Sequence, residues 1–263
     1  MSTSYATDLN DDQWELIFPF FPSPKSGGRP REVSRRAIIN AIFYVTATGC
    51  AWHLLPHDFP KWKTVYHYFR QWHLDGIWTV IHDQLARWER GAQGHQASPS
   101  AASLDSQSVK TATPAAVCVG IDGGKLIKGR KRHILVDTLG LILMVVVTAA
   151  NVSDPQGARL IFSRLQQWPE RMTRLVRIWV DGTYAGKAFM EWTMDTYRWI
   201  LETIKRSDTM KGFVVLPKRW VVERTFGWLN WSRRLSKDYE ILPETSETFI
   251  YIAMIRVLVR RLA

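Results

Sequence analysis

The sequence predicts an α/β domain, in which helices flank a mixed sheet, preceded by a small all-α domain. Residues 10–90 carry apolar side chains at helical spacing, whereas short apolar runs alternate with helical segments after residue 101. Between them, residues 91–101 contain Gly, Ser and Pro and lack apolar periodicity, which is typical of a linker. We therefore expect two domains, residues 1–95 and residues 96–263.

The N-terminal domain should consist of short helices. Asp11 and Asp12 suit the cap and first turn of the first helix, and Gly49 is placed for a left-handed stop of the second. A basic helix follows, with Lys61, Lys63 and Arg70 beside an apolar stripe. This arrangement favours a helix-turn-helix-like DNA-binding domain, with a helical dimerisation module as the alternative. We expect helices at residues 11–21, 34–48, 61–74 and 77–90.

A cationic, breaker-rich loop at residues 25–31 separates the first two helices. Its Gly28-Arg29-Pro30 core resembles the AT-hook tripeptide, which places arginines in a narrow minor groove. On this reading Arg29 and Arg31 contact DNA. The alternative is a solvated linker.

The second domain should alternate strands and helices. Its 141–148 strand is continuously apolar, which predicts a central position in the sheet, and the 137–140 segment is typical of a hairpin turn. Asp154 is expected to cap the helix that follows. We expect strands at residues 102–109, 133–136, 141–148, 175–180 and 199–204, and helices at 155–167, 187–196, 217–236 and 249–262.

Three acids occupy unusual positions in this order. Asp105 is expected inside the first strand, Asp181 at the end of the fourth, and Glu223 on a basic, aromatic helix, so we expect all three to converge at one sheet edge. A buried carboxylate needs compensation, and hard carboxylate oxygens suit Mg²⁺ or Mn²⁺. The alternative for Glu223 is an ordinary surface ion pair with Arg219 or Arg224. The rival acids Asp122, Asp137 and Asp154 occupy turn or cap positions and are expected to be structural.

The charge balance favours a polyanionic partner. Lys and Arg total 35 against 24 Asp and Glu, which gives a net charge of +11. No apolar stretch is long enough to span a membrane and the first ten residues do not look like a leader, so we expect a cytoplasmic protein without a membrane partner. Five cations crowd one expected turn, where they either grip phosphates or form a disordered charged loop: Lys125, Lys128, Arg130, Lys131 and Arg132.

Four strings resemble bacterial insertion-sequence transposases, and more closely the insertion sequence five family: SLDSQSV (103–109), GGKLIKGRKRHI (123–134), VDGTYAG (180–186) and RWVVERTFGW (219–228). The resemblance spans essentially the whole chain. It implies a ribonuclease H-like catalytic domain with Asp105, Asp181 and Glu223 as an Asp-Asp-Glu triad, and Arg219 matches the arginine of the family signature. Two positions depart from that signature, because Leu216 replaces a tyrosine and Asn230 replaces a lysine.

The resemblance implies a DNA transposase that binds terminal inverted repeats, cleaves at the element ends and joins the 3′-hydroxyl ends to target DNA. It further implies two Mg²⁺ or Mn²⁺ ions at the triad, double-stranded DNA as partner, and a homodimer or higher synaptic oligomer. The rival interpretations are a transposase-derived repressor without catalysis and a metal-dependent nuclease of the same fold. Further DNA contacts are expected from Arg219, Trp220, Arg224, Arg233 and Arg234.

Overall fold

The computed structural model describes residues 4–23, 33–204 and 217–263. The cationic loop with Arg29 and Arg31, and Leu216, lie outside these residues. The chain forms two compact units, which we call the helical unit and the sheet unit. The helical unit comprises Met1–Glu89, Leu229–Ser236 and Thr248–Ala263, and the sheet unit comprises Arg90–Trp228 and Lys237–Glu247. Two C-terminal segments therefore belong to the helical unit, although the sequence placed them with the second domain.

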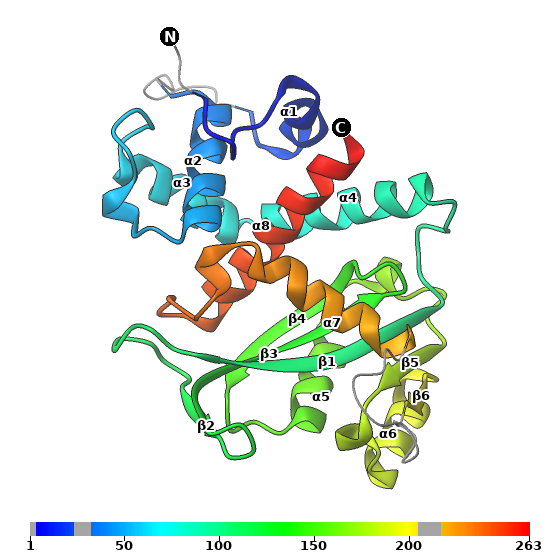
Figure 1. Cartoon of the computed structure of the whole chain (residues 1–263). Coiled ribbons are helices and arrows are strands. Elements are labelled where there is room, and N and C mark those ends of the chain that lie inside the picture. Colours follow the sequence, from blue (N-terminus) through cyan, green and yellow to red (C-terminus); the bar gives the residue numbers. More distant parts are fainter. Residues whose placement is uncertain (1–3, 24–32, 205–216) are drawn as a thin grey trace. The chain divides into compact units, whose positions relative to one another are not determined.

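The N-terminal part of the helical unit is all α, as predicted (Figure 1). Its helices are α1 (Asp11–Ile17), α2 (Arg35–Thr48), α3 (Trp62–Leu74) and α4 (Ile77–Ala92), the last running on into the sheet unit. The first cap is Asn10, whose side chain accepts the Gln13 N–H, and not an aspartate. Gly49 ends α2 in the left-handed conformation, with φ at 74°, as its position predicts.

The sheet unit contains a six-stranded mixed sheet. Its strands are β1 (Ala101–Lys110), β2 (Gly120–Asp122), β3 (Ile127–Asp137), β4 (Ile142–Ala149), β5 (Arg177–Val180) and β6 (Ile200–Thr203). The order is β2-β3-β1-β5-β6, and β4 also pairs with β3. β3 is antiparallel to β1, β2 and β4, whereas β1, β5 and β6 run parallel. This arrangement confirms the predicted mixed sheet.

The predicted central position of the apolar strand β4 is wrong. Within the described sheet β4 pairs with β3 alone, so it lies at an edge. Its apolar sequence reflects burial, since Leu143, Met144 and Val146 belong to the main core. The Val147 N–H donates to Glu247 Oε1 at 2.8 Å, which satisfies one backbone group of this strand.

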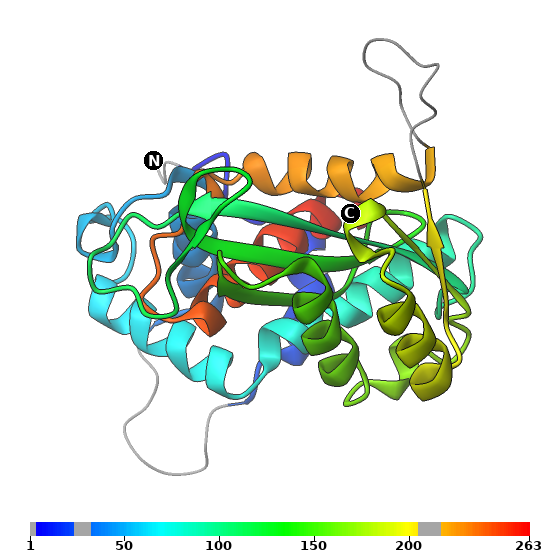
Figure 2. The same cartoon turned by 90° about the horizontal axis from the view of Figure 1, so that it is seen from below.

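Helices cover both faces of the sheet (Figures 1 and 2). α5 (Asp154–Leu165) and α6 (Lys187–Tyr197) lie on one face, where Phe162 and Phe189 stack with ring centres 6.1 Å apart. Ser153, and not Asp154, caps α5 in a capping box with Gln156. α7 (Pro217–Asn230) lies on the opposite face, and α8 (Pro243–Leu262) ends the chain. Among the described residues, no helix is long and apolar enough to cross a membrane.

α7 docks on the turn between β3 and β4. The Thr225 hydroxyl donates to the Gly140 carbonyl at 2.8 Å, and the Arg224 guanidinium donates to the Leu139 carbonyl at 2.9 Å. Gly140 has φ at 81°, and a Cβ there would lie 2.7 Å from Thr225 Oγ1 and 3.0 Å from the Trp228 ring. Only glycine fits this turn without strain or a clash.

β3 begins six residues earlier than predicted, and this removes three cations from the expected phosphate-binding turn. Arg130, Lys131 and Arg132 lie within the strand and are buried, because side chains of β3 face packed elements on both sides. Arg130 is fully buried and pairs with Asp238 at 3.0 Å. Desolvation lowers the pKa of Arg132 to about 10, and its guanidinium donates to the Lys237 carbonyl at 3.2 Å.

The Arg130 side chain fixes the C-terminal segment of the sheet unit to β3. Besides Asp238, its guanidinium donates to the carbonyls of Val117, Glu240 and Ile241. A buried ion pair contributes little net stability, but removal of one partner leaves an uncompensated buried charge. Arg130 is therefore a structural residue.

We expect Arg130→Leu to destabilise the protein by about 3–5 kcal/mol, because it removes the ion-pair partner of the buried Asp238 carboxylate. Urea unfolding measures the change. The matched control is Lys128→Leu, two residues earlier on β3, where an exposed side chain is replaced and a change within about 0.5 kcal/mol is expected. Equal stability of the two variants would contradict the structural role.

Candidate active site

Asp105, Asp181 and Glu223 meet around one guanidinium nitrogen. Arg219 Nη2 lies 3.9 Å from Asp105 Oδ2, 3.8 Å from Asp181 Oδ2 and 4.0 Å from Glu223 Oε1. The register of the sheet explains two of these positions. β1 and β5 are parallel neighbours in which Ala101 pairs with Arg177 and Ser103 with Trp179, so the same offset places Asp105 level with Asp181. α7 contributes both Arg219 and Glu223, one helical turn apart.

Backbone groups hold two of the three carboxylates. Asp105 Oδ1 accepts the Ser106 N–H at 2.7 Å, and Asp181 Oδ1 accepts the Thr183 N–H at 2.8 Å. In both residues the other oxygen, Oδ2, is the one near Arg219. The Glu223 side chain is 49% exposed against 19% for Asp105 and is therefore less constrained. The two aspartates are fixed in orientation, and the glutamate can still adjust.

The environment of Asp105 disfavours its charged form. Burial, together with the neighbouring Asp181 carboxylate, raises its pKa to about 6. The Ser106 N–H, the Arg219 guanidinium and the Lys125 ammonium act in the opposite direction. Asp105 is therefore ionised at neutral pH at an energetic cost that a nearby cation reduces.

The turn between β2 and β3 brings Lys125 within electrostatic reach of Asp105. Asp122 organises this turn, since its Oδ1 accepts the N–H groups of Gly124 and Lys125, each at 3.1 Å. Its Oδ2 accepts the Ser108 hydroxyl of β1. Asp122 thus ties the turn to the strand that carries Asp105, a role that sequence reasoning missed because strand β2 is only three residues long.

The other two rival acids are structural, as expected. Asp137 forms an ion pair with Arg90. Asp154 accepts the Ser106 hydroxyl at 2.7 Å and lies 3.1 Å from the Lys131 ammonium. Ser106 follows Asp105 directly, so this pair anchors β1 on the face opposite Asp105. Lys131 is therefore an internal counter-ion and not a phosphate contact.

The donor set of the acid cluster suits a hard divalent cation. Three carboxylates from separate elements face one point, and each aspartate keeps one oxygen that no backbone group engages. In the structure as described, no group of three or more His, Cys, Asp or Glu side chains is close enough to hold a metal ion. The point that the three carboxylates share is occupied by Arg219. The three carboxylates are therefore ligands of the type that Mg²⁺ or Mn²⁺ prefers, whereas their present arrangement surrounds the Arg219 guanidinium.

The expected DNA-contacting residues divide by exposure. The prediction that Arg234 contacts DNA is wrong. Arg234 is buried, its guanidinium donates to the Cys50 carbonyl at 3.0 Å, and it stacks on the Phe249 ring. Its neighbour Arg233 is exposed. The exposed members of the expected set are Lys61, Lys63, Arg70, Lys125, Lys128, Trp220 and Arg233.

Arg224 lies between two tryptophans of α7. Its guanidinium carbon is 4.9 Å from the Trp220 ring centre and 4.7 Å from that of Trp228. Trp228 is buried, and Trp220 forms the exposed end of the stack. Trp231, just beyond the end of α7, is 70% exposed, although a large aromatic residue at such a position is usually buried.

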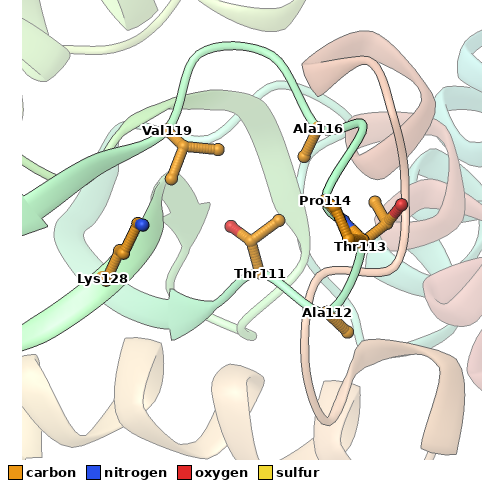
Figure 3. Close-up of a pocket in the computed structure, with 7 residues that line it drawn as sticks. All are labelled: Thr111, Ala112, Thr113, Pro114, Ala116, Val119 and Lys128. Carbon is orange, nitrogen blue, oxygen red and sulfur yellow. The ribbon is translucent and has the colours of Figure 1, made fainter.

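A pocket of about 470 Å³ lies at the far end of β1. Figure 3 shows Thr111 and Lys128 among its lining residues, together with Pro114 and Val119. Thr111 is six residues beyond Asp105, so the pocket lies roughly 20 Å along the strand from the acids. It is separate from the carboxylate cluster.

Comparisons with known proteins match both parts of the chain. A family model described as a transposase of the IS4/5 family matches residues 9–82, and one described as a transposase DDE domain matches residues 96–258. An uncharacterised 16.2 kDa protein of insertion element IS402 from Burkholderia cepacia is 33% identical over 109 residues, covering 39% of this chain and 72% of that protein. A protein named as the transposase for IS402, from the same organism, is 32% identical over 128 residues, covering 46% of this chain and 59% of that protein.

Among solved structures, the Mos1 transposase paired-end complex with left transposon end matches with a TM-score of 0.28 and 13% identity. The match covers 95% of this chain and 84% of that chain.

We expect Asp105→Asn to raise the melting temperature above pH 6 in the presence of EDTA. The folded protein raises the carboxyl pKa from 3.8 to about 6, so ionisation of Asp105 has its full cost in stability at pH values above 6. The cost is small near pH 4, where the group is protonated in the folded state and about half protonated in the unfolded state. Asparagine removes that cost and still accepts the Ser106 N–H. Thermal melts from pH 4 to pH 8 measure the difference.

The control for this experiment is Asp195→Asn, a substitution on the exposed surface of α6. Its melting temperature should follow that of the parent at every pH. A gain by Asp105→Asn that is equally large at pH 4 would show that ionisation is not its cause.

Proposed function

Because the chain belongs to the family of transposases with an Asp-Asp-Glu (DDE) catalytic domain, we propose that it cleaves DNA at element ends and joins the freed 3′-hydroxyls to target DNA, with Asp105, Asp181 and Glu223 as its catalytic carboxylates. The observation that carries the proposal is the convergence of these acids around Arg219. They come from β1, β5 and α7, and the same three positions match the family motif.

The three carboxylates would hold Mg²⁺ or Mn²⁺, and two such ions would supply activation of the attacking oxygen and stabilisation of the leaving one. Orientation of the carboxylates and binding of DNA phosphates are roles of the protein's own residues. The Asp105 and Asp181 oxygens are oriented by the Ser106 and Thr183 N–H groups. Lys125, on the anchored turn beside Asp105, is placed to bind a phosphate of the reacting strand.

The surroundings favour direct phosphoryl transfer over a covalent protein–DNA step. Ser106 follows Asp105 in the chain, and its hydroxyl donates a hydrogen bond to the Asp154 carboxylate. Tyr184 follows Asp181 closely, but it is buried and desolvation raises its pKa well above the usual value. Neither group is a ready nucleophile. Water and the DNA 3′-hydroxyl are the proposed nucleophiles.

End recognition is proposed for the helical unit. Lys61 lies at the N-cap of α3, Lys63 and Arg70 lie along it, and all three are exposed, so that this basic helix can lie against a groove. A pocket of about 490 Å³ opens beside the start of this helix and includes both lysines in its lining. Because two element ends react together, we propose a homodimer or larger synaptic assembly.

Two other functions use the same fold. A transposase-derived repressor would need the DNA-binding surface without the acid cluster, and the intact triad argues against it. A metal-dependent nuclease would cleave DNA without joining it. A strand-transfer assay separates the nuclease from the transposase, because only the latter produces joined molecules.

Asp105→Asn, Asp181→Asn and Glu223→Gln should each reduce end cleavage and strand transfer by at least about 1,000-fold in Mg²⁺, because each removes a metal ligand. Binding to the element ends should change little. Gel assays of cleavage, joining and binding on one labelled substrate measure all three. Asp195→Asn serves as the surface control, and near-parental joining by any triad variant would refute the assignment.

Lys61→Ala with Lys63→Ala should weaken end binding and reduce its dependence on salt. Each lost phosphate contact lowers the slope of log K against log salt by about one. Fluorescence anisotropy at several salt concentrations gives the slope. The control is Lys187→Ala with Lys218→Ala, which removes two exposed lysines of the sheet unit outside the proposed contact set. An unchanged slope in the α3 variant would exclude both lysines as contacts.

A further inference from the structure

Arg219 has a position that its expected role as a DNA contact does not explain. A single nitrogen of its guanidinium lies within 4.0 Å of one oxygen from each of the three acids. A surface ion pair between Arg219 and Glu223, four residues apart on α7, would leave the two aspartates uninvolved. The side chain instead reaches across to β1 and β5 and is only 23% exposed.

The three acids need this charge when the protein is free of DNA. Three carboxylates directed at one point repel one another, because each lies within 4.0 Å of the same guanidinium nitrogen. Lys125 acts on Asp105 from the neighbouring turn, whereas Arg219 contacts all three acids. Arginine suits this place because it stays charged and offers several N–H donors in a planar fork.

The same guanidinium is also suited to a phosphate, which binds arginine in a bidentate manner. Its neighbour Arg224 is less free to move, because it donates to the Leu139 carbonyl and lies between two tryptophans. Arg219 forms only long contacts, of 3.8–4.0 Å, with its three partners. It can therefore leave the acids at modest cost when a DNA phosphate replaces them.

We propose that Arg219 is a positioning residue that holds the three carboxylates together in the DNA-free protein and moves to a DNA phosphate on binding, which leaves the carboxylates to a divalent cation. This inference rests on the proposed function of the triad. Arg219 and the cation compete for the same oxygens, so DNA and cation strengthen each other's binding. The protein thereby has a weak cation site until DNA is present.

The test measures Mn²⁺ binding to the full chain by electron paramagnetic resonance, at pH 7.5 and without DNA. Arg219→Gln should bind Mn²⁺ at least about 10-fold more tightly than the parent, since it removes a competing charge about 4 Å from each ligand oxygen. Arg219→Lys keeps the charge and should stay near the parent. The matched control is Lys218→Gln, which removes the adjacent exposed charge, paired with Glu202, and should change affinity less than about two-fold at this exposed site.

The second measurement adds a 30-base-pair DNA duplex of mixed sequence at low salt. In the parent the duplex should increase Mn²⁺ affinity, whereas in Arg219→Gln the increase should be largely absent. Equal or weaker Mn²⁺ binding by Arg219→Gln without DNA, or an undiminished effect of the duplex in that variant, would overturn the proposal. Melting curves in EDTA confirm that each variant is folded.

Asp105→Asn and Asp181→Asn distinguish failure of this inference from failure of the proposed function. Both variants should lose most Mn²⁺ binding. If they retain parental affinity, the carboxylates are not the cation site and the proposed function fails with the inference. If they lose binding while Arg219→Gln resembles the parent, the triad stands and the role of Arg219 alone is refuted.

Discussion

The parallel pairing of β1 with β5 is the constraint on which the acid cluster depends. Its register sets Asp105 level with Asp181 at the point where β5 ends. A slip by one residue would turn Asp105 to the other face of β1, where Ser106 now bonds to Asp154. α7 then needs only to cross this edge for Glu223 to complete the group. The chemistry proposed for the protein is therefore a consequence of strand register.

Charge inside the sheet unit is managed by pairing. On β3, Arg130 forms an ion pair with Asp238 and Lys131 forms one with Asp154, and the two cations lie on opposite faces of the strand. The first pair retains the C-terminal segment, and the second anchors β1 beside Asp105. The basic residues of the chain therefore have two roles. Some form ion pairs within the fold, and only the others are available to bind a polyanion.

The sequence was sufficient to predict the alternation of strands and helices, the mixed sheet and the three acids, because hydrophobic periodicity and an acid in an apolar strand are local signals. The extent of β3 was not predictable in this way. A run such as residues 128–132 resembles a solvated turn, and its burial depends on Asp238, more than 100 residues later. Asp122 shows the same limit, since its partner Ser108 is brought near only by the folded sheet. Trp231 shows the opposite case, because its aromatic side chain is typical of a core residue and the fold leaves it exposed.

Gly140, in the β3–β4 turn, packs directly against α7, the helix that carries Glu223. A methyl group at Gly140 would press on Thr225 and Trp228, which follow Glu223 by two and five residues on the same rigid helix. Any relief of that clash tilts or shifts the helix and carries Glu223 with it. On the proposed mechanism, a single change in this hairpin therefore silences a copy of the gene that keeps all three acids, and inspection of the acids alone would not identify that copy as inactive.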